Sequence, residues 1–175
     1  MKSVQIWEIL TSRRFCKLSR FKSEIILRKI VKLEILALTK QKLAHKISTL
    51  ENLIAETRAA NNETKSSMGD KYETSREMVQ QEINNLQIQL GEHLRAQEVL
   101  TKISSALMEK AGSGSLVETD KGLFYIAVSL GEMNFNNKKI FLISPESPLA
   151  KAMNGKSAGE KFTLNGTEQT IKNIW

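Results

Sequence analysis

The chain has 175 residues, which suits one ordinary domain or a small domain joined to an elongated element. Two prolines, 6% aromatic residues and one cysteine, Cys16, argue against a disulfide-built secreted module and favour a reducing compartment. The net charge of +7 lies mostly in residues 1–34, which contain nine Lys or Arg and three Glu, whereas the remainder is nearly neutral. The composition therefore does not indicate a general nucleic-acid-binding surface over the body of the protein.

Residues 1–34 form a basic extension whose role the sequence leaves open. Arg28, Lys29, Lys32 and Glu34 interrupt its apolar part, so it lacks the run of about 20 apolar residues that spans a bilayer. It also lacks the uncharged core of a secretory signal. The alternatives are a continuation of the first helix, a translation start nearer residues 36–38, an organelle-targeting segment, or a basic amphipathic helix on a membrane or nucleic acid.

Residues 35–110 contain apolar side chains at alternating spacings of four and three, which predicts two long helices. The first set comprises Leu36, Leu43, Ile47, Leu50 and Ile54, and the second comprises Val79, Ile83, Leu86 and Leu90. Folding the second helix back on the first would bring four apolar layers into register. We therefore predict an antiparallel coiled-coil hairpin with its tip near residues 61–73. Near the base, Lys40 and His93 would face each other as polar residues that fix the register.

The tip carries Gly69, Asp70 and Glu73 where the second helix begins. Asp at the N-cap position with Glu three residues later matches a capping box, which satisfies free backbone N–H groups. The same two carboxylates lie within one turn and also suit a hard divalent ion such as Mg²⁺. Because Mg²⁺ requires six oxygen ligands, a second macromolecule would have to supply the others. Both interpretations remain open at this point.

Residues 111–175 are predicted to form a small α+β module after a helix-breaking AGSGS segment. Strands are predicted at residues 116–119, 123–128 and 139–143, followed by a hairpin of 160–164 and 167–174 with a type I′ turn at Asn165 and Gly166. Ser147 at the N-cap and Pro148 at the first helical position predict a short helix over 149–154, which Gly155 ends. The expected result is an antiparallel sheet with one helix on a face.

The run ISPESPLAKAMNGKSAGE at residues 143–160 resembles the signature I-S-x-x-S-P-L-(G/A)-x-A-(L)-x-G-K-x-x-G-(D/E) of bacterial Gre-type (GreA/GreB) transcription elongation factors. Gly114, Ser115, Val117 and Asp120 fit the opening of the FKBP-like carboxy-terminal domain of that family. The order of hairpin and domain also matches, and the resemblance covers about residues 36–175. It implies an α+β fold in which a coiled-coil hairpin precedes an FKBP-like domain.

The resemblance also implies a function. The protein would be a cytoplasmic monomer that binds RNA polymerase, with the hairpin in the secondary channel and Ser147, Pro148 and Leu149 at the channel rim. It would meet RNA and DNA only within the elongation complex and would not contact a membrane. It would not be an enzyme by itself. Asp70 and Glu73 would help hold a Mg²⁺ shared with the polymerase, whose own active centre would then cleave backtracked RNA.

The tip departs from the family pattern G-D-(L)-x-E-N-x-E-Y. Gly69, Asp70 and Glu73 match, but Thr74 stands where the family has Asn, and Arg76-Glu77-Met78 follows in place of the Glu-Tyr pair. Basic side chains nearby dilute the negative charge of the tip. Two functions are therefore open: a factor that stimulates RNA cleavage, and a channel-binding regulator without cleavage activity.

Two further alternatives belong to other functional classes. One is a chaperone-like or prolyl-isomerase-like binding module, and the other is a structural coiled-coil adaptor. An active isomerase lines its pocket with aromatic side chains. Here we expect Phe124, Tyr125, Phe141 and Phe162 to fill the small core instead.

Overall fold

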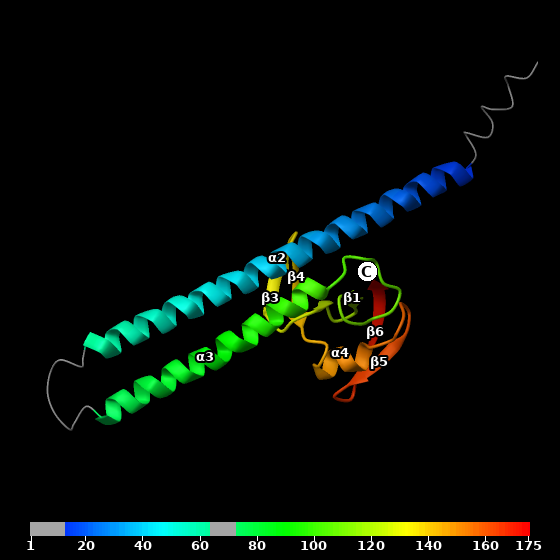
Figure 1. Cartoon of the computed structure of the whole chain (residues 1–175). Helices are drawn as coiled ribbons and strands as arrows, with labels where there is room; N and C mark the ends of the chain where they lie inside the picture. The colour runs from blue at the N-terminus through cyan, green and yellow to red at the C-terminus, as the bar shows by residue number, and fades with distance from the viewer. Residues whose placement is uncertain (1–12, 64–72) are drawn as a thin grey trace, which may run out of the picture.

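The computed structural model of the chain describes residues 13–63 and 73–175 and shows a long helix pair beside a small sheet domain (Figure 1). The pair consists of α2 (Arg13–Glu63) and α3 (Glu73–Lys102). Both consist mostly of good helix formers, with no proline and with Gly91 as their one glycine. At 1.5 Å per residue, the 51 residues of α2 span about 76 Å and the 30 residues of α3 about 45 Å. Helix α2 therefore extends well past the end of α3 (Figure 1).

The two helices run side by side in opposite directions (Figure 1), and the predicted apolar positions are buried or half-buried. The buried members are Leu36, Leu43, Ile47, Ile54, Ile83 and Leu86. The half-buried members are Leu50, Val79 and Leu90. The helical hairpin predicted from the four-three spacing is thus confirmed.

The prediction for the base of the hairpin is wrong at one position. Lys40 is exposed rather than turned inward, although His93 is half-buried. The inward side chains of α2 at this level are Lys32, Ile35 and Thr39, each with 0% exposure. The physical reason is that the sheet domain also packs against α2 here, so side chains such as Thr39, which contacts Met133, are buried in addition to those that face α3.

Helix α2 continues through residue 34 without a break. The described part of the basic extension and the first arm of the hairpin therefore belong to one helix. Between residues 25 and 33, α2 exposes apolar side chains, among them Ile26 at 59% and Leu27 at 61%. Among the residues that the structure describes, no helix is both long enough and apolar enough to cross a membrane.

The carboxy-terminal domain is a six-stranded sheet with one short helix. Its elements are β1 (Leu116–Thr119), β2 (Leu123–Ile126), β3 (Gly131–Phe135), β4 (Lys138–Ile143), α4 (Pro148–Met153), β5 (Lys161–Leu164) and β6 (Thr167–Ile174). The strand order is β3-β4-β2-β1-β6-β5. All neighbouring strands are antiparallel except β2 and β4, which run parallel with Leu123 beside Ile140. The predicted α+β fold class is confirmed.

Two details of the sheet differ from the sequence prediction. Strand β3 was missed, because it is an edge strand on which only Met133 and Phe135 are half-buried. The parallel pairing of β2 with β4 was also not predicted. The turn between β3 and β4 uses Asn136 and Asn137 with φ of 48° and 60°, and the predicted turn at Asn165 has the same left-handed geometry, with φ of 51°.

Helices cover both faces of the sheet, so the domain has two apolar cores. Along β2 and just beyond it, Phe124 and Ile126 belong to the core beneath α4, whereas Tyr125 and Ala127 belong to the core beneath the hairpin. This alternation follows from the two-residue period of a strand. The expected helix on one face is α4, and the base of the hairpin covers the other.

Candidate protein-binding surfaces

The short helix α4 begins at a corner of the sheet domain as the sequence predicted. The Ser147 hydroxyl accepts a hydrogen bond from the backbone N–H of Ala150 at 3.2 Å, and Pro148 occupies the first helical position. Leu149 is half-buried against the core beneath α4. Ser147 and Leu149 therefore have structural roles, whereas Pro148 is exposed and free to meet a partner.

The rest of the 143–160 motif shapes the chain after α4. Gly155 has φ of +76°, a left-handed conformation that suits glycine and ends the helix. Its N–H donates to the carbonyl of Ala111 at 2.8 Å, which ties α4 to the segment that leaves the hairpin. A carboxylate oxygen of Glu160 accepts from the N–H of Ser157. The motif residues therefore hold the turn after α4 in one conformation, and none of the contacts described here positions a catalytic group.

The exposed part of this corner combines an apolar ring with an ion pair. The Lys151 Nζ lies 3.0 Å from a carboxylate oxygen of Glu146, and both side chains are largely exposed. Such a pair contributes little stability in water. Pro148 with Glu146 and Lys151 is thus a small mixed surface, here called the α4 corner, that suits contact with another protein.

The predicted metal ligands at the tip cannot be placed together. Asp70 lies outside the described residues, and Glu73 is the first residue of α3, with its side chain also outside them. Over the ranges that are described, there is no cluster of three His, Cys, Asp or Glu side chains that would hold a metal. The capping box and the metal role of this pair both stay predictions.

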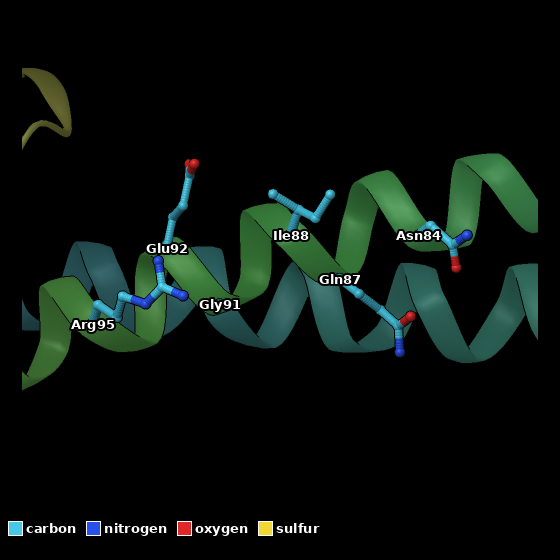
Figure 2. A pocket seen from close by; sticks show the side chains of 6 residues that line it. All are labelled: Asn84, Gln87, Ile88, Gly91, Glu92 and Arg95. Atoms are coloured by element: carbon cyan, nitrogen blue, oxygen red, sulfur yellow. The ribbon is translucent and has the colours of Figure 1, made fainter.

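The outer face of α3 carries a shallow hollow, with a volume of about 420 Å³, at Gly91 (Figure 2). A Cβ atom added at Gly91 would meet nothing within 4 Å, so the glycine is not required by packing inside the chain. Ile88 and Glu92 project from the helix beside it, and Ile88 is 63% exposed. This side of the hairpin is open to a partner.

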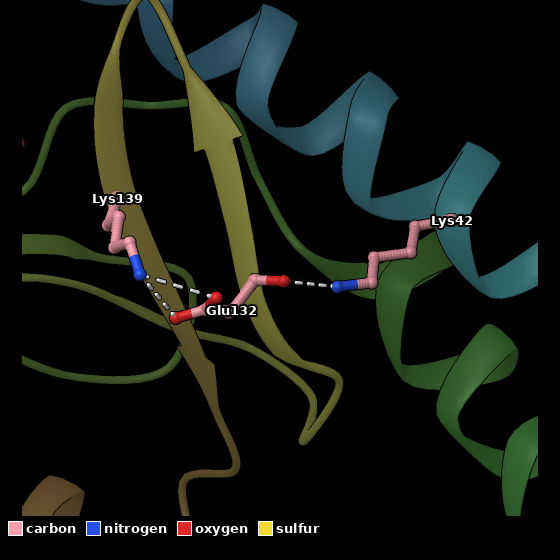
Figure 3. Close-up of polar contacts among 3 residues, drawn as sticks. All are labelled: Lys42, Glu132 and Lys139. Carbon is pink, nitrogen blue, oxygen red and sulfur yellow. Dashed lines mark hydrogen bonds and ion pairs between the residues drawn. The ribbon is translucent and has the colours of Figure 1, made fainter.

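A stripe of side chains on α2 fixes the hairpin to the sheet domain. The Lys42 ammonium donates to the backbone carbonyl of Glu132 on β3, whose carboxylate also lies 3.3 Å from Lys139 (Figure 3). Thr39 contacts the Met133 sulfur at 4.0 Å. These contacts set the direction in which the hairpin leaves the sheet.

Further along the same stripe, Lys32 donates to the carbonyl of Ala106 in the segment between α3 and β1. Burial lowers the pKa of this ammonium from 10.5 to about 8, because the charged form loses water. Arg28 lies over the ring of Trp175 at 5.8 Å, in a cation–π contact with the end of the chain.

Sequence reasoning missed this stripe, although a signal was present. Its members Arg28, Lys32, Ile35, Thr39 and Lys42 are spaced by four and three residues, as on one face of a helix. Four of the five are polar, however, so their spacing does not produce an apolar periodicity in the sequence. The contact of the extension with the sheet domain is therefore visible only in the structure.

The chain resembles solved structures of one named factor at low identity. The transcription factor Gfh1 has 17% identity and a TM-score of 0.33, with 77% of this chain and 92% of that chain covered. GreA factor homolog 1 (Gfh1) of Thermus thermophilus has 17% identity, a TM-score of 0.33 and coverage of 78% and 94%. Gfh1 of Thermus aquaticus has 20% identity, a TM-score of 0.31 and coverage of 77% and 92%.

No family model and no curated protein sequence matches the chain.

Proposed function

We propose that the chain is a Gre-type transcription factor that binds RNA polymerase, with the α2–α3 hairpin in the secondary channel and the sheet domain at its rim. The observation that carries the proposal is the combination, in one molecule, of a projecting two-helix hairpin with the 143–160 motif folded as a capped, exposed corner. The resemblance of that motif to the Gre signature supplies the partner.

The hairpin has the dimensions and surface of an element that enters another molecule. From Lys42, where α2 contacts the sheet domain, to Glu63, the helix runs about 32 Å. Two helices bury only their shared face, so the outer side chains Leu53, Met78 and Ile88 are 41–69% exposed. A channel that surrounds the hairpin would cover these apolar groups.

The sheet domain fits the role of a stop at the channel rim. Lys32, Thr39 and Lys42 hold it against the base of the hairpin, so the two parts would meet the polymerase as one body. On this proposal the α4 corner contacts the polymerase through Pro148, and Ser147 and Leu149 hold the corner in shape. The protein would act as a monomer in the cytoplasm.

The tip would act through the metal of the polymerase. Asp70 and Glu73 would offer carboxylate oxygens to a shared Mg²⁺, an ion that stabilises developing negative charge in phosphoryl chemistry. The chain itself would remain non-enzymatic, because hydrolysis would take place in the active centre of the polymerase. A capped first turn of α3 would fix the direction of both side chains.

A second candidate function is a regulator that occupies the channel without stimulating cleavage. The observation that favours it is the presence of basic residues beside the tip carboxylates, where Lys65 and Lys71 accompany Arg76, which is exposed on α3. Three cations near two carboxylates weaken the negative potential that attracts Mg²⁺. Thr74 stands where the Gre family has Asn. If the Asn amide contacts the Mg²⁺, its replacement by Thr would weaken Mg²⁺ binding further.

The test of the partner is binding to purified core RNA polymerase. We expect the wild type to bind and Pro148→Glu to bind at least fivefold more weakly. Glutamate suits the first turn of a helix, so α4 should persist. The control Lys172→Glu makes a charge change on an exposed residue of β6 and should stay within twofold of the wild type. Absence of binding by the wild type would overturn the proposal.

The test of the tip uses stalled, backtracked elongation complexes. If the tip assists Mg²⁺, the wild type shortens the RNA and Asp70→Asn with Glu73→Gln loses at least tenfold in rate while still binding. Equal shortening by both proteins would refute the metal role. Binding without shortening by either protein would establish the channel-binding regulator.

A further inference from the structure

Helix α2 carries a row of exposed apolar side chains before it reaches the hairpin. Ile26 is 59% exposed, Ile30 and Leu33 are each 45% exposed, and Ala37 is also exposed. The four residues are spaced by four, three and four, so they lie on one face of the helix, here called the α2 outer face. An exposed apolar row of this kind is typical of a surface that contacts another molecule.

The α2 outer face is turned away from the sheet domain. At 3.6 residues per turn, it lies roughly opposite Lys32, Ile35 and Thr39, which are fully buried on the side where α2 meets that domain. In this region α2 also extends past the end of α3 (Figure 1). A second helix can therefore lie along the outer face without meeting the sheet domain.

The spacing of the row is that of a coiled coil. In a seven-residue repeat, Ile30 and Ala37 take the first position, and Ile26 and Leu33 take the fourth. A β-branched residue at the first position with leucine at the fourth favours two parallel strands, and Ile30 with Leu33 matches this preference. From Ile26 to Ala37 the helix axis covers about 17 Å. The contact is therefore short, and we expect a reversible association rather than a permanent one.

The charges beside the row complement a second copy of the same chain. Lys29 takes the seventh position of the repeat and Glu34 the fifth, and both side chains are exposed. In a parallel coiled coil these positions meet across the seam, so Lys29 of each copy would pair with Glu34 of the other. In an antiparallel pair, Glu34 would lie beside Leu27 of the other copy and would lose water without gaining a cation.

We propose that two copies of the free chain associate in parallel through the α2 outer face. Ile26, Ile30 and Leu33 of each copy pack against their counterparts, and two Lys29–Glu34 ion pairs flank the seam. The two sheet domains lie on the outside of the dimer, and the two hairpins point in the same direction. This dimer concerns the free protein and does not depend on the proposed function, in which the polymerase binds a single chain.

The test is sedimentation velocity of the full-length chain over a range of concentrations. A reducing agent keeps Cys16 from forming a disulfide between copies. We expect a monomer–dimer equilibrium with a dissociation constant in the micromolar range, as suits a short interface. A wild type that stays monomeric at several hundred micromolar would overturn the proposal. If such a monomer bound vesicles of anionic lipid through this helix, the apolar face would belong to a membrane-binding helix instead.

Two matched variants test whether the α2 outer face is the interface. Ile30→Lys places a charge in the seam and should raise the dissociation constant about tenfold or more. Leu53→Lys makes the same kind of change on α2 but outside this face, at a residue that is 41% exposed, and should stay within twofold of the wild type. Both residues are exposed in the monomer, and circular dichroism would show that both variants fold. Equal effects of the two variants, or an unweakened dimer of Ile30→Lys, would overturn the proposal.

Charge reversal tests the parallel direction. Lys29→Glu and Glu34→Lys should each raise the dissociation constant about three- to tenfold, because two attractive pairs become repulsive. The double variant Lys29→Glu with Glu34→Lys restores opposite charges across a parallel seam and should return to within twofold of the wild type. A double variant that dimerises no better than the single variants would contradict the parallel pairing.

Discussion

Replacement of Lys32 tests the fixation of the hairpin to the sheet domain. The ammonium is fully buried, donates to the Ala106 carbonyl and has its pKa lowered from 10.5 to about 8 by desolvation. A lowered pKa of a base means that the folded state releases its proton first as the pH rises. Between pH 8 and pH 10.5 the unfolded state therefore binds more protons, and stability rises with pH.

The size of this rise follows from the two pKa values. For a single group that titrates at about 8 in the folded state and 10.5 in the unfolded state, the free energy of unfolding increases by about 2 kcal/mol between pH 8 and pH 10. Above pH 10 an opposite effect begins, because burial raises the pKa of Tyr125 to about 12. The unfolded tyrosine then ionises first and stability falls, so pH 8 to 10 is the clean window.

The assay is urea unfolding followed by circular dichroism at pH 7, 8, 9 and 10 for the wild type, Lys32→Met and Lys40→Met. Methionine retains the length of the side chain without its charge. We expect the stability of the wild type relative to Lys32→Met to increase by about 2 kcal/mol from pH 8 to pH 10. Lys40 is exposed on the same helix, so Lys40→Met should follow the wild type. Parallel pH profiles for Lys32→Met and the wild type would show that burial does not lower the pKa of Lys32 in the folded protein.

Three further substitutions test the packing, also by urea unfolding. Leu43→Ala should lower the free energy of unfolding by about 2–5 kcal/mol, because the side chain is fully buried, whereas Leu53→Ala, which is 41% exposed, should change it by less than about 0.5 kcal/mol. Equal effects would contradict the assigned inner face. Ser147→Ala should cost about 1 kcal/mol through loss of the cap on α4, with Ser147→Asp as the variant that retains it; an unchanged Ser147→Ala protein would refute the cap. Tyr125→Phe should be neutral or stabilising by up to about 1 kcal/mol, because the buried hydroxyl has no hydrogen-bond partner among the described residues. A clear loss of stability would indicate a partner for that hydroxyl.

The elements predicted well from the sequence are those with local or periodic signals. The inner face of the hairpin follows from apolar spacing alone, and Leu43 and Ile83 lie where that spacing places them. The start of α4 follows from two residues, Ser147 and Pro148, whose preferences act within one turn. Local rules of this kind need no knowledge of the rest of the fold.

The elements that were missed depend on contacts between distant segments. Strand β3 is an edge strand, and the direction in which β4 pairs with β2 is set by the path of the chain between them. On α2, Thr39 rather than Lys40 turns inward because the sheet domain covers that face. The start of α4 was predicted correctly, but Ser147 and Leu149, two of the three residues predicted to contact the polymerase, serve the domain itself. Only Pro148 of the three is exposed.

Site-specific photocrosslinking would show directly whether the hairpin inserts into the secondary channel. A benzophenone amino acid at Gln81, which is exposed on α3 toward the tip, would report what surrounds the hairpin in a complex with RNA polymerase. A matched probe at Lys172 on β6 reports the sheet domain. We predict that Gln81 crosslinks to polymerase residues lining the secondary channel and that Lys172 does not. Crosslinks from Gln81 to the outer surface of the polymerase, or to no polymerase residue in a complex that forms, would contradict it.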